Sequence, residues 1–327
     1  MPRRPAPLPE SLREPAFTLA EARALGVTPG ILAHSRFERP HHGVRRLGSP
    51  QSAPPGRPTY VESRVRARAR DYAPLLRREE CFSHTSALLL HGVPLRAPEE
   101  LHVTVPQPLN RSTGRGVIGH RTSARFAPVR SPSGLPCVPA SLALLQSAAT
   151  LPFLELVVAL DHLRRPRPIP DGASLTESEV DALLIRSRTR GIKRLRDAWS
   201  VSRLGAESRM ESHLHYVLAS MGLDDLELQA DLHDRAGAWI GRFDQVDRAR
   251  RRILEYDGEQ HRTDRQQYLR DLTRLDRARE IGYKILRAHA EDFHPQRLHE
   301  TEGRLCAFLG RAPRPLRAGL ARRFSER

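Results

Sequence analysis

Lysine is almost absent from this 327-residue sequence. Of its 54 basic residues only Lys193 and Lys284 are lysines, so arginine carries nearly all of the positive charge. Acidic residues are missing from one long stretch, because residues 101–150 contain five arginines and no Asp or Glu. The net charge of +16 favours a polyanionic partner, and we expect DNA, since the arginine fork suits phosphate. An anionic membrane surface is the second alternative.

Cysteines and long apolar runs are also scarce. Cys81, Cys137 and Cys306 lie far apart and form no CxxC pair, which argues against a disulfide scaffold and against a zinc ribbon. The N-terminus lacks the apolar segment of a signal peptide, and no later stretch approaches the ~20 apolar residues of a spanning helix. We therefore expect a cytoplasmic protein with no membrane partner and with two or three domains.

The first expected domain is a winged helix-turn-helix at 17–48, preceded by a flexible arm at 1–16. The segment "FTLAEARALGVTPGIL" predicts two short helices with a turn at Gly26, the first of them capped by Thr18. A basic hairpin through Gly43 follows. Two short helices and such a hairpin are typical of this class of DNA-binding unit.

The basic hairpin supplies the expected nucleic-acid contacts of this domain. We expect the second helix to enter a major groove, with His42, Arg45 and Arg46 beside the phosphates. The alternative is an ordinary helical hairpin that carries a solvated basic loop.

Residues 60–163 predict an α+β unit, because helical patterns alternate with the strand-like segments "ELHVTVP" and "GVIGHRTS". A linker and an amphipathic connecting helix are expected at 164–206. The fold class predicted for the chain is thus multidomain, with α/β and α+β parts.

The third expected domain covers 207–310 and precedes a basic tail at 311–327. Its hydrophobic patterns and turn residues predict a mixed sheet with the element order αβββαβα. The expected elements are a helix at 207–221, strands at 226–234, 238–247 and 251–257, a helix at 266–281, the strand "YKILRAH", and a helix at 295–309.

Acidic residues gather in two neighbouring strands of this domain. If the turn of their hairpin is at 249–250, Asp244 lies directly across from Glu255, and Asp257 is two residues further along. Directly opposed side chains have Cβ atoms about 4.5 to 5.5 Å apart, so two carboxylates there repel unless something intervenes. We expect Asp244, Glu255 and Asp257 to bind Mg²⁺ or Mn²⁺, as metal-assisted phosphodiester hydrolysis requires.

Two further residues are expected at the same corner. Glu211 lies at the edge of the apolar stripe of the preceding helix, and His261 follows the strand as a candidate for proton transfer. The alternative is a solvated strand end, in which the acids pair with Arg242 or Arg252.

Residues 207–308 resemble the Vsr-like branch of the PD-(D/E)xK nuclease superfamily. The likeness rests on Glu211, on Asp244, on the segment "EYDGEQH", on the helix "RDLTRLDRAREIG" and on the strand "YKILR". It implies a restriction-endonuclease-like fold with Glu211, Asp244, Glu255, Asp257 and His261 as the catalytic group. Asp257 stands where the superfamily usually has a lysine, and an acid there followed by a histidine is similar to the Vsr-like pattern.

Residues 17–165 faintly resemble the AbiEi-like antitoxins of type IV toxin-antitoxin systems, which begin with a winged helix. The segments "FTLAEARALGVTPGIL", "GVRRL", "SHTSALLLHGVPL" and "LHVTVP" carry this likeness, whereas Gln146 stands where an acid is expected. The resemblance implies a cognate toxin or a regulatory partner.

The function expected from the sequence is metal-dependent cleavage of DNA, with Arg274 and Arg287 positioning phosphates. A non-catalytic regulator or antitoxin with a degenerate nuclease domain is the alternative. An RNA-directed nuclease is a third possibility.

Overall fold

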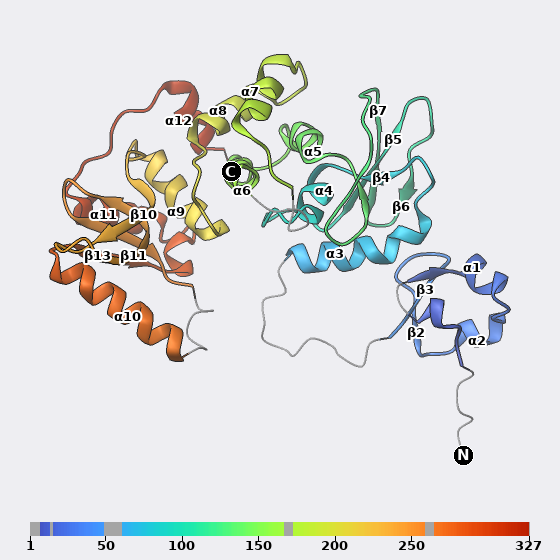
Figure 1. Cartoon of the computed structure of the whole chain (residues 1–327). Coiled ribbons are helices and arrows are strands. Elements are labelled where there is room, and N and C mark those ends of the chain that lie inside the picture. Colours follow the sequence, from blue (N-terminus) through green and yellow to red (C-terminus); the bar gives the residue numbers. More distant parts are fainter. Residues whose placement is uncertain (1–6, 14–15, 49–60, 167–172, 259–264, 327) are drawn as a thin grey trace. The chain divides into compact units, whose positions relative to one another are not determined.

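The computed structural model describes residues 7–13, 16–48, 61–166, 173–258 and 265–326 (Figure 1). The chain is a mixture of helices and three β-sheets, which confirms the multidomain α and β class. It divides into two compact units. Unit 1 comprises residues 1–147 with 167–173, and unit 2 comprises residues 148–166 with 174–327.

Unit 1 begins with a small three-stranded sheet of order β1-β3-β2 and two short helices. Its elements are η1 (Glu10–Leu12), β1 (Phe17–Thr18), α1 (Leu19–Ala24), α2 (Pro29–Ala33), β2 (Phe37–Glu38) and β3 (Val44–Leu47). The expected capping box is present, since Thr18 accepts from the Glu21 backbone and the Glu21 carboxylate accepts from Thr18 N. The second helix ends at Ala33, and Phe37 pairs with Leu47 in the sheet.

The core of this small sheet includes residues that composition assigned to a flexible arm. Leu8 and Leu12 are buried against Phe17 and Phe37, whose rings meet edge to face with centroids 6.0 Å apart. The arm prediction is therefore wrong for residues 7–13, because two leucines spaced four apart bury one apolar face there.

The rest of unit 1 contains a six-stranded sheet of order β6-β7-β5-β4-β9-β8. Its helices are α3 (Val61–Tyr72), η2 (Ala73–Leu75), α4 (His84–Leu90) and α5 (Ala140–Ser147). Its strands are β4 (Cys81–Phe82), β5 (Leu101–Pro106), β6 (Thr113–Gly114), β7 (Val117–Thr122), β8 (Val129–Arg130) and β9 (Pro136–Cys137). Strands β5 and β7 were both predicted, and they pair in parallel.

Unit 2 begins with helices that the sequence assigned to the α+β unit at 60–163 and to the connecting segment at 164–206. They are α6 (Phe153–Arg164), α7 (Glu177–Arg186) and α8 (Ile192–Val201), and the chain ends in α12 (Ala318–Phe324). The prediction of a single connecting helix at 164–206 is wrong. Gly191 adopts a left-handed conformation with φ 89° and separates α7 from α8. Phe324 of α12 packs its ring on Phe153 with centroids 5.6 Å apart, so the end of the chain is not a free tail.

The remainder of unit 2 follows the predicted order of elements. They are α9 (Arg209–Ser220), β10 (Glu227–His233), β11 (Trp239–Asp247), β12 (Arg252–Tyr256), α10 (Arg265–Glu280), β13 (Lys284–Ala288), η4 (Ala290–Phe293) and α11 (Leu298–Leu309). The four strands form one sheet of order β10-β11-β12-β13, in which the β12-β13 pair is parallel and the others are antiparallel.

This sheet is covered on both faces (Figure 1). On one face Leu254 packs with Leu214 of α9 and Leu305 of α11. On the other face Ile253 packs with Leu275 of α10. Adjacent residues of β12 thus enter opposite cores, as strand alternation requires.

All three cysteines are free; Cys81 and Cys137 are buried and Cys306 is partly buried. Within the ranges that the structure describes, no helix has both the length and the apolar character needed to cross a membrane.

Candidate functional site

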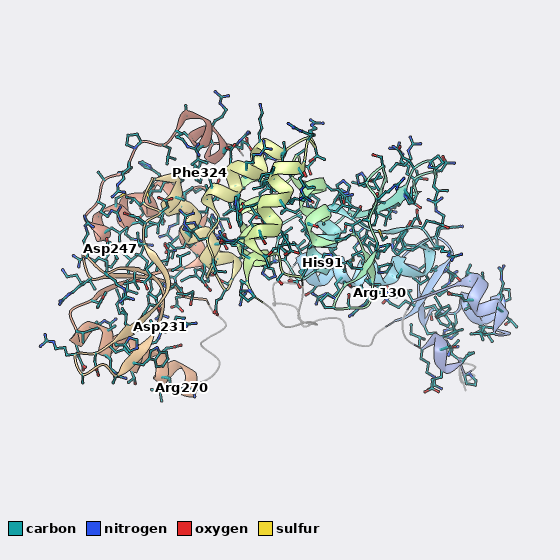
Figure 2. The ribbon with its side chains drawn as sticks, turned by 45° about the horizontal axis from the view of Figure 1, so that its top comes forward. His91, Arg130, Asp231, Asp247, Arg270 and Phe324 are labelled. Carbon is teal, nitrogen blue, oxygen red and sulfur yellow. The ribbon has the colours of Figure 1, made fainter. Side chains whose placement is uncertain are left out.

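The β11-β12 hairpin has the register that was predicted. Gln245 pairs with Leu254, Val246 with Ile253 and Asp247 with Arg252, so the same register places Asp244 across from Glu255. Asp247, labelled in Figure 2, ends β11 and accepts from Arg250 N at 3.0 Å, which closes the turn. The expected juxtaposition of Asp244 and Glu255 follows from this register.

Asp244 is held by two hydrogen bonds. Its Oδ2 accepts from the backbone N–H of Tyr256 at 2.9 Å, and its Oδ1 accepts from the side-chain amide of Gln229 at 3.2 Å. Burial raises the pKa of Asp244, and these two donors oppose that effect. The carboxylate is thus fixed in position but has a reduced tendency to ionise.

Gln229 connects Asp244 to Glu211. Its Nε2 also donates to Glu211 Oε2 at 3.0 Å, so one amide group bridges two carboxylates. Burial, and then the nearby Asp244 carboxylate, raise the pKa of Glu211 to about 7. Gln229 has φ 48°, a left-handed conformation that is strained for a residue with a side chain.

Sequence reasoning did not identify Gln229. The β10-β11 register pairs Leu228 with Gln245 and Ala230 with Phe243, which places Gln229 opposite Asp244. Extending the hairpin alignment by one strand would have found it.

Both carboxylate oxygens of Glu255 accept a hydrogen bond from the same arginine. Arg274 of α10 donates from Nη1 to Oε1 and from Nη2 to Oε2, both at 2.9 Å, while its guanidinium lies 4.6 Å from the Phe243 ring centroid. Burial still raises the pKa of Glu255 to about 7, with Arg274 opposing that effect and Asp244 adding to it. Glu255 is therefore poised to change its charge near neutral pH.

Asp257 follows β12 and has an arginine and a histidine as neighbours. Arg287 Nη2 lies 2.8 Å from Asp257 Oδ1, and His289 Nδ1 lies 3.7 Å from Oδ2. Arg287 is the β13 partner of Glu255, so it stands between the two acids. His261 lies outside the described residues.

Two arginines of this corner pair with its carboxylates in the structure. Arg274 and Arg287 were expected to hold phosphate, but both hold carboxylates, because a buried carboxylate needs a counter-charge. Arg242, proposed in the alternative interpretation as the partner of the acids, is exposed and pairs with Asp231.

The donor set of the corner suits a cation bound by two carboxylates. Glu211 and Asp244 share the amide of Gln229, and burial beside one another disfavours both negative charges. A divalent cation would relieve this repulsion, and Mg²⁺ binds through one or two carboxylates plus water. Asp244, Glu255 and Asp257 are more spread out: in the described part of the chain, only His84, His102 and His120 have three ligand atoms all within 4.8 Å.

On the predicted wing, the three residues differ in availability. His42 is exposed. Arg45 donates to the carbonyls of Leu32 and Val44, and Arg46 pairs with Glu38 and, at 2.7 Å, with Asp71. Two of the three residues thus already have partners within unit 1.

Comparison with known proteins finds two uncharacterised proteins of Mycobacterium tuberculosis, one from strain CDC 1551 / Oshkosh and one from strain H37Rv. Each is 30% identical over 170 residues, which cover 50% of this chain and 60% of the relative. No protein-family model matches the chain. No solved structure matches it either.

Proposed function

We propose that this protein binds DNA and that its C-terminal domain is a metal-dependent endonuclease of the restriction-endonuclease-like, Vsr-like type. The observation that carries the proposal is a linked set of three acids: Gln229 bridges Glu211 and Asp244, the hairpin register places Asp244 across from Glu255, and two of the pKa values are near 7. Strongly perturbed carboxyl groups gathered in one part of a domain are typical of catalytic sites. The order αβββαβα and the parallel β12-β13 pair agree with this type of domain.

Glu211 and Asp244 would hold Mg²⁺ or Mn²⁺, with Glu255 as a further ligand. The bound cation would activate water and stabilise the charge that develops on the phosphoryl group and the leaving oxygen. Without the cation the pKa of Glu211 is about 7, and binding of the cation would favour its ionised form. Gln229 would keep the two carboxylates at a fixed separation.

Unit 1 would supply the electrostatic attraction to the DNA backbone. The five arginines of the acid-free stretch 101–150 are all exposed, and they are Arg111, Arg115, Arg121, Arg125 and Arg130. Contacts of arginine with phosphate give affinity without reading sequence. The small N-terminal sheet with α1 and α2 would be the winged helix that adds sequence preference, with His42 toward the DNA.

The test of catalysis is nicking of supercoiled plasmid in the presence of Mg²⁺ or Mn²⁺. We expect Asp244→Asn and Glu211→Gln each to lower the cleavage rate by about 10² or more, because each removes a proposed ligand of the cation. Asp276→Asn is the matched control, since Asp276 is an exposed residue of α10 paired with Arg279. Cleavage that persists in Asp244→Asn would contradict the proposed site.

A non-catalytic regulator or antitoxin is the second candidate, and the Arg274–Glu255 pair favours it. A bidentate guanidinium already neutralises the carboxylate that a cation would need. This candidate predicts intact plasmid together with a specific gel shift on a promoter fragment. That combination would refute the proposed endonuclease activity and support the proposed DNA binding.

DNA binding has a test of its own. Because each lost phosphate contact lowers the salt dependence of the association constant, Arg121→Gln combined with Arg125→Gln should reduce the slope of log K against log salt by about 2. Arg279→Gln on α10 is the matched control, since this arginine is exposed and pairs with Asp276 within its own helix. An unchanged slope would remove these two arginines from the interface.

A further inference from the structure

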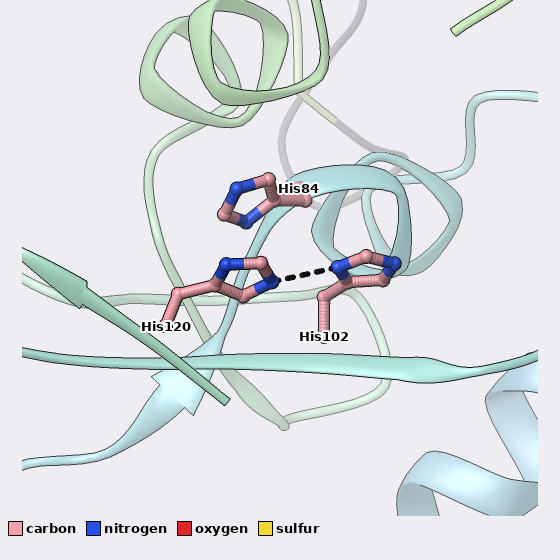
Figure 3. A group of neighbouring side chains, drawn as sticks. All are labelled: His84, His102 and His120. Atoms are coloured by element: carbon pink, nitrogen blue, oxygen red, sulfur yellow. Dashed lines mark hydrogen bonds between the residues drawn. The ribbon is translucent and has the colours of Figure 1, made fainter. Parts of the chain in front are cut away.

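Three histidines meet in unit 1, and the function proposed above does not use them. His84 begins α4, His102 lies in β5 and His120 lies in β7 (Figure 3). The parallel β5-β7 register pairs His102 with Ile118 and Thr104 with His120, so both histidines are on one face of the sheet, one step apart. Tertiary structure therefore brings together residues that are 18 and 36 positions apart in the chain.

The ring nitrogens of the three histidines converge. One nitrogen from each ring lies within 4.8 Å of the other two, and no other group of three His, Cys, Asp or Glu among the described residues does so. His102 Nδ1 and His120 Nε2 are 2.9 Å apart. The His84 ring stacks on the His120 ring with centroids 3.8 Å apart. The three rings lie nearly parallel, with interplanar angles of 27°, 24° and 9°, so a shared metal ion requires the rings to rotate.

The separation of the His102 and His120 nitrogens is close to that in a tetrahedral zinc site. Two imidazole nitrogens at ~2.0–2.1 Å from zinc in tetrahedral geometry lie about 3.3 Å from each other. The 2.9 Å between His102 and His120 needs to open by only a few tenths of an ångström. Rotation of the rings about their side-chain bonds can supply a movement of that size.

The protonation state of the rings suits metal binding. Burial, and then the neighbouring imidazoles, lower the pKa of His84 to about 3 and that of His102 to about 4. Burial and then Arg111 lower the pKa of His120, while Glu100 acts in the opposite direction on His102. A neutral imidazole has one N–H and one nitrogen with a free lone pair, so one of the two facing nitrogens of His102 and His120 carries the hydrogen between them, and a metal ion would displace it.

The surroundings hold His84 in an unusual conformation. Its φ is 50°, a strained backbone for a residue with a side chain. Gln146 Oε1 accepts from His84 N at 3.2 Å, and His84 Nδ1 lies 3.0 Å from Ser83 Oγ. A hydrogen bond at Nδ1 leaves Nε2 as the nitrogen available for a metal, which is how partners of ligating histidines usually act.

The ligand types indicate which metal would bind. Imidazole nitrogen suits zinc, nickel, copper and iron, whereas magnesium prefers oxygen. All three histidines are partly exposed, so a fourth position would be open to water or to an anion.

We propose that His84, His102 and His120 form a three-histidine site for a divalent transition metal of the zinc class, with one coordination position open. The site is separate in sequence and in chemistry from the acidic corner of unit 2. Its existence does not depend on whether the protein cleaves DNA.

The test uses the untagged full-length protein and Co²⁺ as a spectroscopic probe that replaces zinc. We expect one Co²⁺ per chain with the strong visible absorption of tetrahedral geometry, and displacement of Co²⁺ by Zn²⁺. His102→Gln and His120→Gln should each raise the dissociation constant for Co²⁺ at least about tenfold, a change of 1.4 kcal/mol, and the double variant should lose the absorption. Circular dichroism of the metal-free variants establishes that they are folded.

Two control variants separate this site from other metal ligands. His299→Gln removes an exposed histidine of α11, and Asp244→Asn removes a ligand expected for Mg²⁺. Both should keep the Co²⁺ absorption. Absorption that is absent from the wild type, or that persists in the double variant, overturns the proposal.

A second measurement needs no variant. Zn²⁺ should protect His84, His102 and His120 of the wild type from diethyl pyrocarbonate, as located by peptide mass spectrometry, while His299 stays reactive. Equal modification with and without Zn²⁺ also overturns the proposal.

Discussion

Replacing Glu255 with glutamine should change how the stability of unit 2 depends on pH. Glu255 is 6% exposed and has a pKa of about 7 in the folded protein, against 4.5 as the ordinary value. Between these two pH values the folded state binds more protons than the unfolded state, so the protein loses stability as pH rises. That difference in pKa corresponds to about 3 kcal/mol of unfolding free energy, of which about 2 kcal/mol falls between pH 5 and pH 8.

Glutamine cannot ionise, so the Glu255→Gln variant lacks this loss. The free energy of unfolding of the variant minus that of the wild type should therefore increase by about 2 kcal/mol from pH 5 to pH 8, whatever its starting sign. Urea unfolding followed by tryptophan fluorescence measures it, because Trp199 and Trp239 both lie in unit 2. Loss of the Arg274 contact changes this difference in unfolding free energy by the same amount at every pH. It therefore does not alter how the difference depends on pH.

Glu300→Gln is the matched control, since that side chain is 76% exposed, and its difference from the wild type should stay constant with pH. A constant difference for Glu255→Gln would mean that Arg274 outweighs burial and keeps Glu255 ionised. A difference that decreases with pH would mean that its pKa is below 4.5. Either result refutes the reasoning about this carboxyl group.

Three substitutions test packing and capping by urea unfolding. Gly241→Ala should cost about 1 to 3 kcal/mol, because the new Cβ would lie 2.4 Å from Arg274 Cδ, and an unchanged stability would show that Arg274 moves freely. Phe324→Ala should destabilise unit 2 by roughly 1 to 3 kcal/mol through loss of the edge-to-face contact with Phe153, and no effect would mean that α12 is not part of the unit. Thr18→Ala should cost about 1 kcal/mol through loss of the capping box of α1, whereas Thr18→Ser should keep most of it.

The acidic corner shows which contacts a local sequence pattern can predict and which it cannot. Strand alternation and a two-residue turn predicted the register that puts Asp244 across from Glu255, because both depend on neighbours within one hairpin. The same pattern did not identify the partners of these acids. Arg274 comes from a helix that crosses the sheet, and Gln229 comes from the next strand. The domain contains many arginines, all with the same charge and length, so the sequence does not indicate which of them pairs with Glu255.

The domain boundaries show the same limit. The helix α6 falls at the end of the segment 60–163, which composition assigned to the middle unit. It belongs to unit 2, where Glu155 pairs with Arg209 and the Phe153 ring meets Tyr216. Proline-rich segments mark where a chain bends, and they do not determine which core an apolar helix face enters.

By itself, the sequence determined the class of the fold, the order of elements in the C-terminal domain, the cap of α1 and the hairpin register. Each of these depends on residues within a few turns or one hairpin. Their spacing along the chain determines which local structure has the lowest free energy. Only the tertiary structure decided that arginines neutralise Glu255 and Asp257, that Gln229 bridges two carboxylates, and that three histidines converge. Such contacts join distant segments, and their partners are chosen by the way helices pack on the sheets.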